Sequence, residues 1–301
     1  MRHRQGGVAL VLVLWVVTLL AVIAGNFAFS MRNEAQIARN FLSTAQARAF
    51  ADAGVQRAWH ELMKPPSDAL RWQADGLPRE FDFQGAVLRV TLEDESGKID
   101  INTGSDALLM GLLMSVGLSA DASTKLVDAI LDWRDADKLR RLHGAEEEDY
   151  RAAGKSYGPS NAPFETVDEL QRVLGMTSAL FRKLAPAVTV YSKQMGINTT
   201  VAPPAALLAI PGSTPVLVEQ YLTLRQGLLA SGQKVPVFPG AGAFASASTG
   251  MPTFMARSEA RLPDGSVFVR LAAARVTPDP KRPVTVLRWG DGESELAIEK
   301  Q

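Results

Sequence analysis

Residues 8–25 read VALVLVLWVVTLLAVIAG, an apolar run without a single charged residue. About 20 apolar residues at about 1.5 Å each cross a hydrocarbon core of about 30 Å. The run lies near the lower limit of that length, and residues 27–29 (FAF) extend it. Arg2 and Arg4 precede it, which favours a cytoplasmic N-terminus and an exported C-terminal body. We therefore expect residues 8–29 to form a membrane-spanning helix.

Helical character continues beyond this run. Between Met31 and Met63 there is no proline, and Gly54 is the only glycine. Apolar residues recur there at helical spacing until Pro65 and Pro66 end the pattern. The recurring apolar residues are Ile37, Phe41, Ala45, Val55, Trp59 and Leu62. The sequence predicts one helix of more than fifty residues, apolar all round in its first third and amphipathic later.

A cleaved secretory signal peptide is the alternative interpretation, with Ala28–Ser30 as a weak small-residue cleavage site. Three features argue against it. The basic leader ends in Gly6 and Gly7, before the apolar run instead of after it. The run is longer than a typical signal core, and the helical pattern does not stop at Ser30.

The leader ending in Gly7, followed by this helix, resembles the N-terminus of type IV pilins and type II secretion pseudopilins. The resemblance implies that a prepilin peptidase cuts between Gly7 and Val8, and that Val8 becomes the methylated N-terminus. Most pilin-like subunits carry Glu as the fifth residue after the cut, whereas this chain has Leu12. In the family that Glu pairs with the N-terminus of a neighbouring subunit, so its loss fits a subunit at the filament tip.

One small sheet is expected, with strands that come from the sequence before and after the middle of the chain. Residues 86–93 alternate apolar and mostly polar side chains, which predicts a strand with one buried face. Further strands are expected at 254–261, 267–276 and 284–289, with a turn at Pro263–Gly265 between the first two. Pilin-like proteins pack such a sheet on the C-terminal half of the long helix.

Residues 96–235 are dominated by helical segments. Stretches 99–118, 165–176 and 197–212 look like copies of one unit, in which a capped helix, a glycine turn and a second helix follow one another. Such helix-hairpin-helix units bind DNA where basic residues at the hairpin meet phosphate. Here the turns have no basic residue, and 96–235 holds fourteen Lys or Arg against fifteen Asp or Glu. We therefore interpret this part as a helical spacer or interaction domain.

Composition excludes several classes of function. The chain has 32 basic and 32 acidic residues, so it has no overall basic field that would gather nucleic acid. It has no cysteine, which excludes disulfides, Cys-type zinc sites and thiol catalysis. Its three histidines are far apart, no Walker loop is present, and the small-residue stretch 240–250 reads as a connector. We expect a protein that works by assembly and not as an enzyme.

The densest group of carboxylates lies in residues 128–149. Asp128, Asp132 and Asp135 fall at i, i+4 and i+7, on one face of a predicted helix. This group is either a solvated acidic face or a calcium site, because Ca²⁺ takes about six to eight hard oxygen ligands from flexible acidic loops. Carboxylates this close would otherwise repel one another.

This pattern of carboxylates does not fit an EF-hand. Asp135, Asp137 and Glu146 match positions 1, 3 and 12 of an EF-hand loop, but Leu139 and Arg140 replace an oxygen ligand and the turn glycine. An irregular calcium site remains as the alternative to a solvated face.

Motifs in the same region resemble the K-type minor pseudopilins of the general secretion pathway. They are AILDWRDAD (129–137), GAE (144–146), Tyr150, and Asn161 ahead of VDEL (167–170). That family inserts a large helical domain into the pilin-like sheet and binds calcium there, and it lacks the Glu that Leu12 replaces. The ligands implied by the match are Asp135, Asp137, Glu146, Asp149 and Asn161, with Asp132 as a further candidate.

The expected fold is α+β: a pilin-like N-terminal transmembrane helix on a small antiparallel sheet, with a large all-α, helix-hairpin-helix-like domain inserted into the sheet. The expected divisions are a cleaved leader (1–7), the transmembrane and filament-core helix (8–29), the pilin-like helix and first strand (30–95), the inserted domain (96–235) and the C-terminal strands (236–301).

The resemblance implies a minor pseudopilin at the tip of the type II secretion pseudopilus, which nucleates and caps the filament that drives export of folded proteins across the outer membrane. Implied partners are the I- and J-type minor pseudopilins, then the H type and the major pseudopilin, the prepilin peptidase and the inner-membrane assembly platform. The chain would span the bacterial inner membrane once, with a periplasmic body. The alternative is a membrane-tethered periplasmic DNA-binding protein of a pilin-like uptake system.

Overall fold

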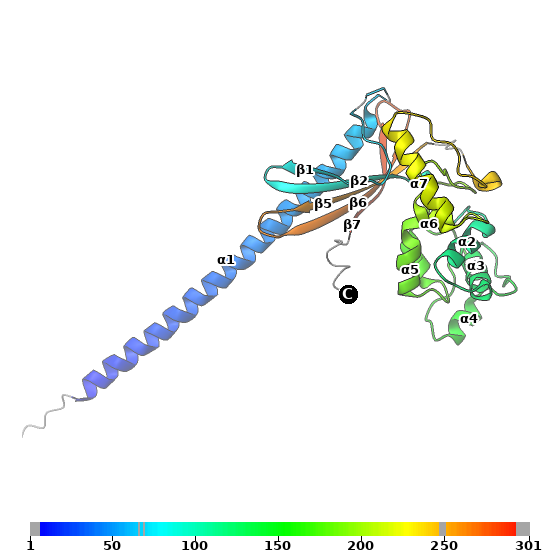
Figure 1. Cartoon of the computed structure of the whole chain (residues 1–301). Coiled ribbons are helices and arrows are strands. Elements are labelled where there is room, and N and C mark those ends of the chain that lie inside the picture. Colours follow the sequence, from blue (N-terminus) through cyan, green and yellow to red (C-terminus); the bar gives the residue numbers. More distant parts are fainter. Residues whose placement is uncertain (1–6, 66, 69, 247–250, 293–301) are drawn as a thin grey trace, which may run out of the picture.

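One uninterrupted helix forms the long axis of the molecule. The computed structural model describes residues 7–65, 67–68, 70–246 and 251–292. Helix α1 (Gly7–Met63) has 57 residues and ends just before Pro65. Its N-terminal part projects away from the body, and its C-terminal part packs against the sheet (Figure 1). The prediction of a single helix of more than fifty residues is confirmed, whereas leader residues 1–6 lie outside the described residues.

Five antiparallel strands form the sheet beside α1. They are β1 (Arg79–Phe83), β2 (Ala86–Asp94), β5 (Thr253–Arg261), β6 (Val267–Val276) and β7 (Val284–Asp291). The order in the sheet is β1-β2-β5-β6-β7, with every neighbouring pair antiparallel. The predicted antiparallel sheet is confirmed. Its central pair, β2 and β5, brings together the two ends of the chain's middle region.

Strand β1 is an addition to the predicted strands. It pairs with β2 through a two-residue turn at Gln84 and Gly85, whose φ angles are 53° and 83°. Both residues are left-handed, which matches the right-handed twist of the strands that a tight hairpin joins. A polar residue followed by glycine before an alternating run is the sequence signal for this hairpin.

The first hydrophobic core lies between α1 and the sheet. Helix α1 contributes Ala47, Ala51, Val55, Ala58 and Leu62, which share one face at helical spacing. Gly54 lies on this face, and a Cβ atom there would come within 2.1 Å of the Ser258 Oγ atom on β5. The helix and the sheet therefore approach more closely at Gly54 than any side chain allows.

The segment between β2 and β5 has a hydrophobic core of its own. Its elements are η1 (Glu95–Gly97), β3 (Ile99–Asp100), α2 (Asp106–Ser115), α3 (Ala120–Arg134), α4 (Glu147–Ala152), η2 (Val167–Arg172), α5 (Ser178–Leu184), η3 (Ala185–Ala187), β4 (Val188–Thr189), α6 (Pro204–Leu208), α7 (Pro215–Ala230) and η4 (Gly242–Phe244). Strands β3 and β4 form a short parallel pair, so this segment is mainly helical and not wholly α.

Three helix–turn–helix units recur in this inserted segment. The turns place Gly117, Gly175 and Gly212 at φ angles of 103°, 90° and 83°. Two residues after each glycine, a hydroxyl side chain caps the second helix by accepting a backbone N–H bond. The capping residues are Ser119, Thr177 and Thr214. The repeated pattern in the sequence thus corresponds to a repeated local structure.

A buried ion cluster joins the inserted segment to the sheet. Lys98 Nζ lies 2.6 Å from a Glu93 oxygen and 2.8 Å from a Glu95 oxygen. Burial alone would lower the pKa of Lys98, but these two carboxylates raise it above its ordinary value. Elsewhere, Arg288 of β7 pairs with Asp168 of η2 at 3.0 Å. Ion pairs, as well as the covalent chain, therefore connect the inserted segment to the sheet.

Candidate functional sites

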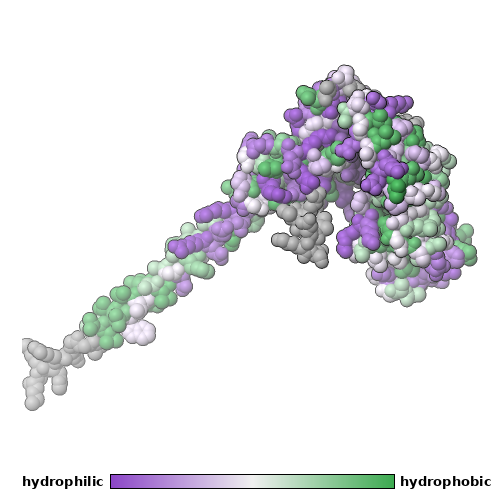
Figure 2. All heavy atoms as spheres, in the orientation of Figure 1, coloured by the Kyte–Doolittle hydropathy of each residue, from purple (hydrophilic) through white to green (hydrophobic). Residues whose placement is uncertain are grey.

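The first candidate site is the exposed surface of α1. The helix is long and apolar enough to cross a membrane, and none of its most apolar window is buried within the described chain. Figure 2 shows this apolar surface along the outer part of the rod, followed by a hydrophilic band before the body. Beyond the band, Phe41 remains 71% exposed and Leu42 remains 69% exposed. These side chains offer a surface to other helices or to lipid.

The predicted cleavage point lies at the start of this helix. Gly7 is the first residue of α1 and Val8 follows it within the helix. Leu12, which stands where most pilin-like subunits have Glu, is 62% exposed on the rod.

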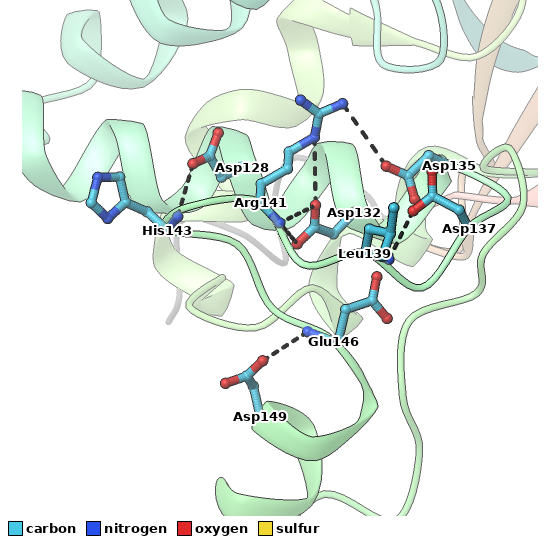
Figure 3. A network of polar contacts seen from close by, with 9 residues as sticks. All are labelled: Asp128, Asp132, Asp135, Asp137, Leu139, Arg141, His143, Glu146 and Asp149. Carbon is cyan, nitrogen blue, oxygen red and sulfur yellow. Dashed lines mark hydrogen bonds and ion pairs between the residues drawn. The ribbon is translucent and has the colours of Figure 1, made fainter.

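The second candidate site is the acidic loop, residues 135–146, between α3 and α4. Asp135 forms the C-cap of α3, and Glu146 forms the N-cap of α4. The loop runs back along α3, so carboxylates from the helix and from the loop meet (Figure 3). On the helix, the Asp128 carboxylate accepts a bond of 3.1 Å from the backbone N–H of His143.

Asp132 on α3 holds the acidic loop in place through its side chain. Its side chain is fully buried and accepts bonds of 3.3 and 3.2 Å from the backbone N–H of Arg141. The Arg141 Nε atom lies 3.4 Å from the same carboxylate. A Cβ atom at Gly144 would come within 1.9 Å of an Asp132 oxygen, so the loop can fold over this carboxylate only with glycine there. Burial raises the pKa of Asp132 despite these bonds.

Among the residues that the structure describes, two buried carboxylate oxygens beside Asp132 have no hydrogen-bond partner. They are Oδ1 of Asp135 and Oε1 of Glu146, whose residue is only 8% exposed. Burial and then the charge of Asp137 raise the pKa of Asp135, and burial and then Asp132 and Asp135 raise the pKa of Glu146. Unpartnered buried oxygens cost free energy. A hard cation that binds oxygen fits this donor set.

The remaining predicted ligands have different surroundings. Asp137 accepts a 2.8 Å bond from the backbone N–H of Leu139. Asp149 accepts a 2.9 Å bond from the backbone N–H of Glu146, and its other oxygen lies 3.0 Å from Arg140. It is therefore committed to the capping box of α4 and to an ion pair.

Asn161 lies in the segment that leads to η2, outside the acidic loop. Its Oδ1 atom is buried without a hydrogen-bond partner in the described part of the chain, and its φ angle is 48°. In addition to burial, Asp132, Asp135 and Asp137 each raise the pKa of Glu146 through their charge, so these four carboxylates lie close enough to repel one another. Within the described ranges, no three His, Asp or Glu side chains are already arranged as a metal cage.

Two features of the site were missed by sequence reasoning. Arg140 and Arg141 supply positive charge inside the loop, and their adjacency to the acidic run is the signal that points to them. Glu146 and Asp149 stand three residues apart, which is the spacing of a capping box.

An aromatic cluster supports the loop from the core side. Trp133 stacks on Phe164 at 6.0 Å between ring centres and lies 6.0 Å from Tyr150. Arg172 sits over the Tyr157 ring at 4.6 Å. The Tyr150 hydroxyl accepts a 2.9 Å bond from the backbone N–H of Leu174. These rings hold the end of α3 and the start of α4 in place.

Comparisons with known proteins agree on one family. Residues 89–193 match the family model described as type II secretion system (T2SS), protein K. The type II secretion system protein K of Klebsiella pneumoniae is 28% identical over 255 residues, covering 77% of this chain and 78% of that protein. Protein K of Pseudomonas aeruginosa is 28% identical over 245 residues, covering 73% of each chain.

The fold also has a solved counterpart. A chain in the crystal structure of the GspK-GspI-GspJ complex from the enterotoxigenic Escherichia coli type 2 secretion system matches with a TM-score of 0.63 at 19% identity. The match covers 85% of this chain and 99% of that one. A long apolar helix on an antiparallel sheet, interrupted by a mainly helical segment, is the fold that this chain shares with that counterpart. By these matches the chain is similar to type II secretion system protein K, and they support its assignment as a minor pseudopilin of that system.

Proposed function

We propose that the chain acts at the tip of the pseudopilus, where it nucleates and caps the filament that drives export of folded proteins across the outer membrane. The shape of the molecule carries this proposal. The inserted segment is attached at the end of the sheet farthest from the N-terminal part of α1, and it extends to one side of the rod (Figure 1). Such a bulk would obstruct a further subunit stacked above it. Leu12, in place of the Glu that pairs neighbouring subunits, supports the same position.

The proposed partners follow from the exposed face of α1. The related crystal structure is of a GspK-GspI-GspJ complex, and we extend that assembly to this chain. The I- and J-type minor pseudopilins would pack against α1 first, followed by the H type and the major pseudopilin. Exposed Ile37, Phe41 and Leu42 supply apolar surface for them, since the adjoining face of α1 is already used by the sheet.

Before assembly, α1 would anchor the chain in the bacterial inner membrane, with its body in the periplasm. The inner-membrane assembly platform would then draw the subunit into the filament. The prepilin peptidase would cut between Gly7 and Val8 and methylate Val8. The charge-free run after Val8 supports an anchor that stays attached after this cut.

We also propose that the acidic loop binds calcium. Asp135, Asp137 and Glu146 would supply oxygens, and Asp149 and Asn161 complete the proposed ligand set. The unpartnered buried oxygens of Asp135, Glu146 and Asn161 support this assignment. A bound calcium ion would neutralise the carboxylates and brace the loop against α3. Asp149 would have to release Arg140 in order to take part.

Co-purification tests the proposed assembly. The full-length chain, co-expressed with I- and J-type pseudopilins and extracted in detergent, is expected to bring down both. Phe41→Asp places a charge on the exposed face of α1 and is expected to abolish that complex. Leu142→Asp is the matched control, because Leu142 is 85% exposed on the inserted segment, far from that face in sequence. An intact complex with Phe41→Asp would contradict the proposed interface.

The DNA-binding alternative receives no support from a specific observation. The turns around Gly117, Gly175 and Gly212 contain no Lys or Arg to meet phosphate. We likewise propose that the chain acts by assembly and not as an enzyme. DNA retention by the purified chain that weakens steeply with salt would argue for the alternative.

A further inference from the structure

The acidic loop already contains a cation of its own. Its sequence KLRRLH (138–143) places Leu139 and Leu142 in solvent, where they are 77% and 85% exposed. Between them, Arg141 turns toward the carboxylates of Asp132 and Asp135 (Figure 3), and Arg140 lies 3.0 Å from an Asp149 oxygen. Arg141 lies 3.4 Å from an Asp132 oxygen through Nε and 3.9 Å from an Asp135 oxygen through Nη2. A guanidinium therefore sits at the carboxylates where a divalent cation would bind.

Asp135 contacts the Arg141 guanidinium and also carries one of the buried oxygens described above. One of its oxygens faces Arg141, while the other is buried and has no hydrogen-bond partner among the described residues. Glu146 is more than nine-tenths buried, and its unpartnered Oε1 belongs to a carboxylate that points toward the part of the loop holding Asp137 (Figure 3). Arg141 contacts the carboxylates of Asp132 and Asp135, and these two charges, together with Asp137, add to the effect of burial in raising the pKa of Glu146.

We propose that Arg141 is a built-in counter-ion that holds the acidic loop closed without metal and sets its affinity for divalent cations. The inference rests on the calcium site proposed above. Calcium and the guanidinium compete for Asp135, so cation binding releases Arg141 from that carboxylate. Because Arg141 lies within the loop, this release shifts the loop and its two exposed leucines.

The expected effect follows from electrostatics. A guanidinium beside Asp135 repels an incoming divalent cation in a partly buried site, where charges are weakly screened. Removing that charge is expected to tighten calcium binding by about tenfold or more. The same change weakens the calcium-free loop, because Asp132 keeps its backbone partners but loses its guanidinium. Arg141 thus lowers the affinity of the loop for calcium, but it keeps the loop ordered when no metal is bound.

Calcium titration of the full-length protein in detergent tests this role. Arg141→Gln is expected to bind calcium about tenfold or more tightly than the unaltered chain. Arg141→Lys keeps the charge and is expected to stay within a few-fold of it. Arg151→Gln is the control, because it removes the same charge from an exposed pair with Glu147 on α4. It is expected to leave the affinity unchanged.

Loop movement supplies a second readout. The chain has no cysteine, so Leu142→Cys provides a single site for an environment-sensitive fluorophore. Calcium is expected to change the emission of this label, and adding Arg141→Gln is expected to produce the changed emission before calcium is added.

The outcomes separate the two proposals. If the unaltered chain does not bind calcium, both the calcium site and the role of Arg141 are overturned. If it binds calcium, but Arg141→Gln binds with the same affinity or more weakly, only the role of Arg141 is overturned. If Arg141→Gln fails to fold, Arg141→Lys and the labelled chain decide: an emission that calcium leaves unchanged overturns the proposed competition.

Discussion

The Arg270 Nε atom on β6 lies 2.6 Å from a carboxylate oxygen of Asp52 on α1. Its Nη1 atom lies 2.5 Å from Asp291 at the end of β7, and its guanidinium rests over the rings of Phe268 and Trp289. Arg270 itself is only 1% exposed. One buried cation therefore connects the long helix, the interior strand β6 and the edge strand β7.

Asp52→Asn is expected to weaken this connection. It removes a charged partner from a buried guanidinium that keeps its pair with Asp291, at a cost of about 1–3 kcal/mol in the free energy of unfolding. Thermal unfolding followed by circular dichroism measures the loss. Glu34→Gln, an acid-to-amide change at an exposed position of the same helix, should leave the melting temperature unchanged. Equal effects of both variants would show that the bond contributes nothing.

Gly54→Ala is expected to separate α1 from the sheet. Alanine is normally favoured over glycine within a helix by about 1 kcal/mol. At Gly54, however, the added Cβ would come within 2.1 Å of Ser258 Oγ and 3.0 Å of a Val90 methyl group. Gly227→Ala in α7 is the control, because nothing lies within 4 Å of the added atom. We expect a lower melting temperature for the first variant and an equal or higher one for the second. A stabilised Gly54→Ala would refute the close approach.

Calcium is expected to raise the melting temperature of the unaltered chain, through binding to the folded state alone. Asp135→Ala combined with Asp137→Ala should abolish that rise. Glu147→Ala combined with Glu148→Ala removes the same charge from α4, outside the acidic loop, and should preserve it. If the melting temperature of the unaltered chain does not respond to calcium, the proposed calcium site is contradicted.

Asp94→Asn is expected to stabilise the protein at neutral pH. Burial raises the pKa of Asp94 although Ser96 donates to it, so the folded state binds its proton more tightly than the unfolded state does. The resulting destabilisation is present above the folded pKa and disappears below the unfolded pKa of about 3.9. The gain in the variant should therefore shrink as the pH falls from 7 toward 4. Urea unfolding across this range measures it, and a gain that does not change with pH would contradict the assignment.

Gly7→Val is expected to block leader removal, since a β-branched side chain hinders entry of an extended backbone into a peptidase cleft. Mass spectrometry of the membrane-extracted chain distinguishes a start at Val8 from a start at Met1. Val13→Ile, inside the apolar run, should leave processing normal. Normal cleavage of Gly7→Val would contradict the leader assignment.

Local periodicity is sufficient to predict much of this fold. The unbroken helical pattern up to Pro65 and the alternating strands are properties of neighbouring residues, and α1 and β2 form where the pattern places them. The β3–β4 pair cannot be predicted in the same way. It joins Ile99 to Val188 across a long stretch of chain, through two-residue strands that carry no periodicity.

The acidic loop likewise combines features that the local sequence predicts with features that it does not predict. The density of carboxylates is enough to predict an acidic cluster, and the resemblance to K-type minor pseudopilins is what implies Asp135, Asp137 and Glu146 as ligands within it. The position of Arg141 depends on the path of the loop back along α3, which a carboxylate pattern does not encode. The commitment of Asp149 to a helix cap follows from its spacing to Glu146, a local signal that fits a capping box as well as a pair of metal ligands.

The register between β2 and β5 has a consequence for the order of folding. Asp94 pairs with Phe254, so the centre of the sheet closes only after residues 95–252 have been brought into a compact loop. Contacts this distant in sequence form slowly, whereas the intervening segment has its own core and can condense first. A chain interrupted before β5 would leave the β1–β2 hairpin with an unpaired edge, which is an opening for aggregation.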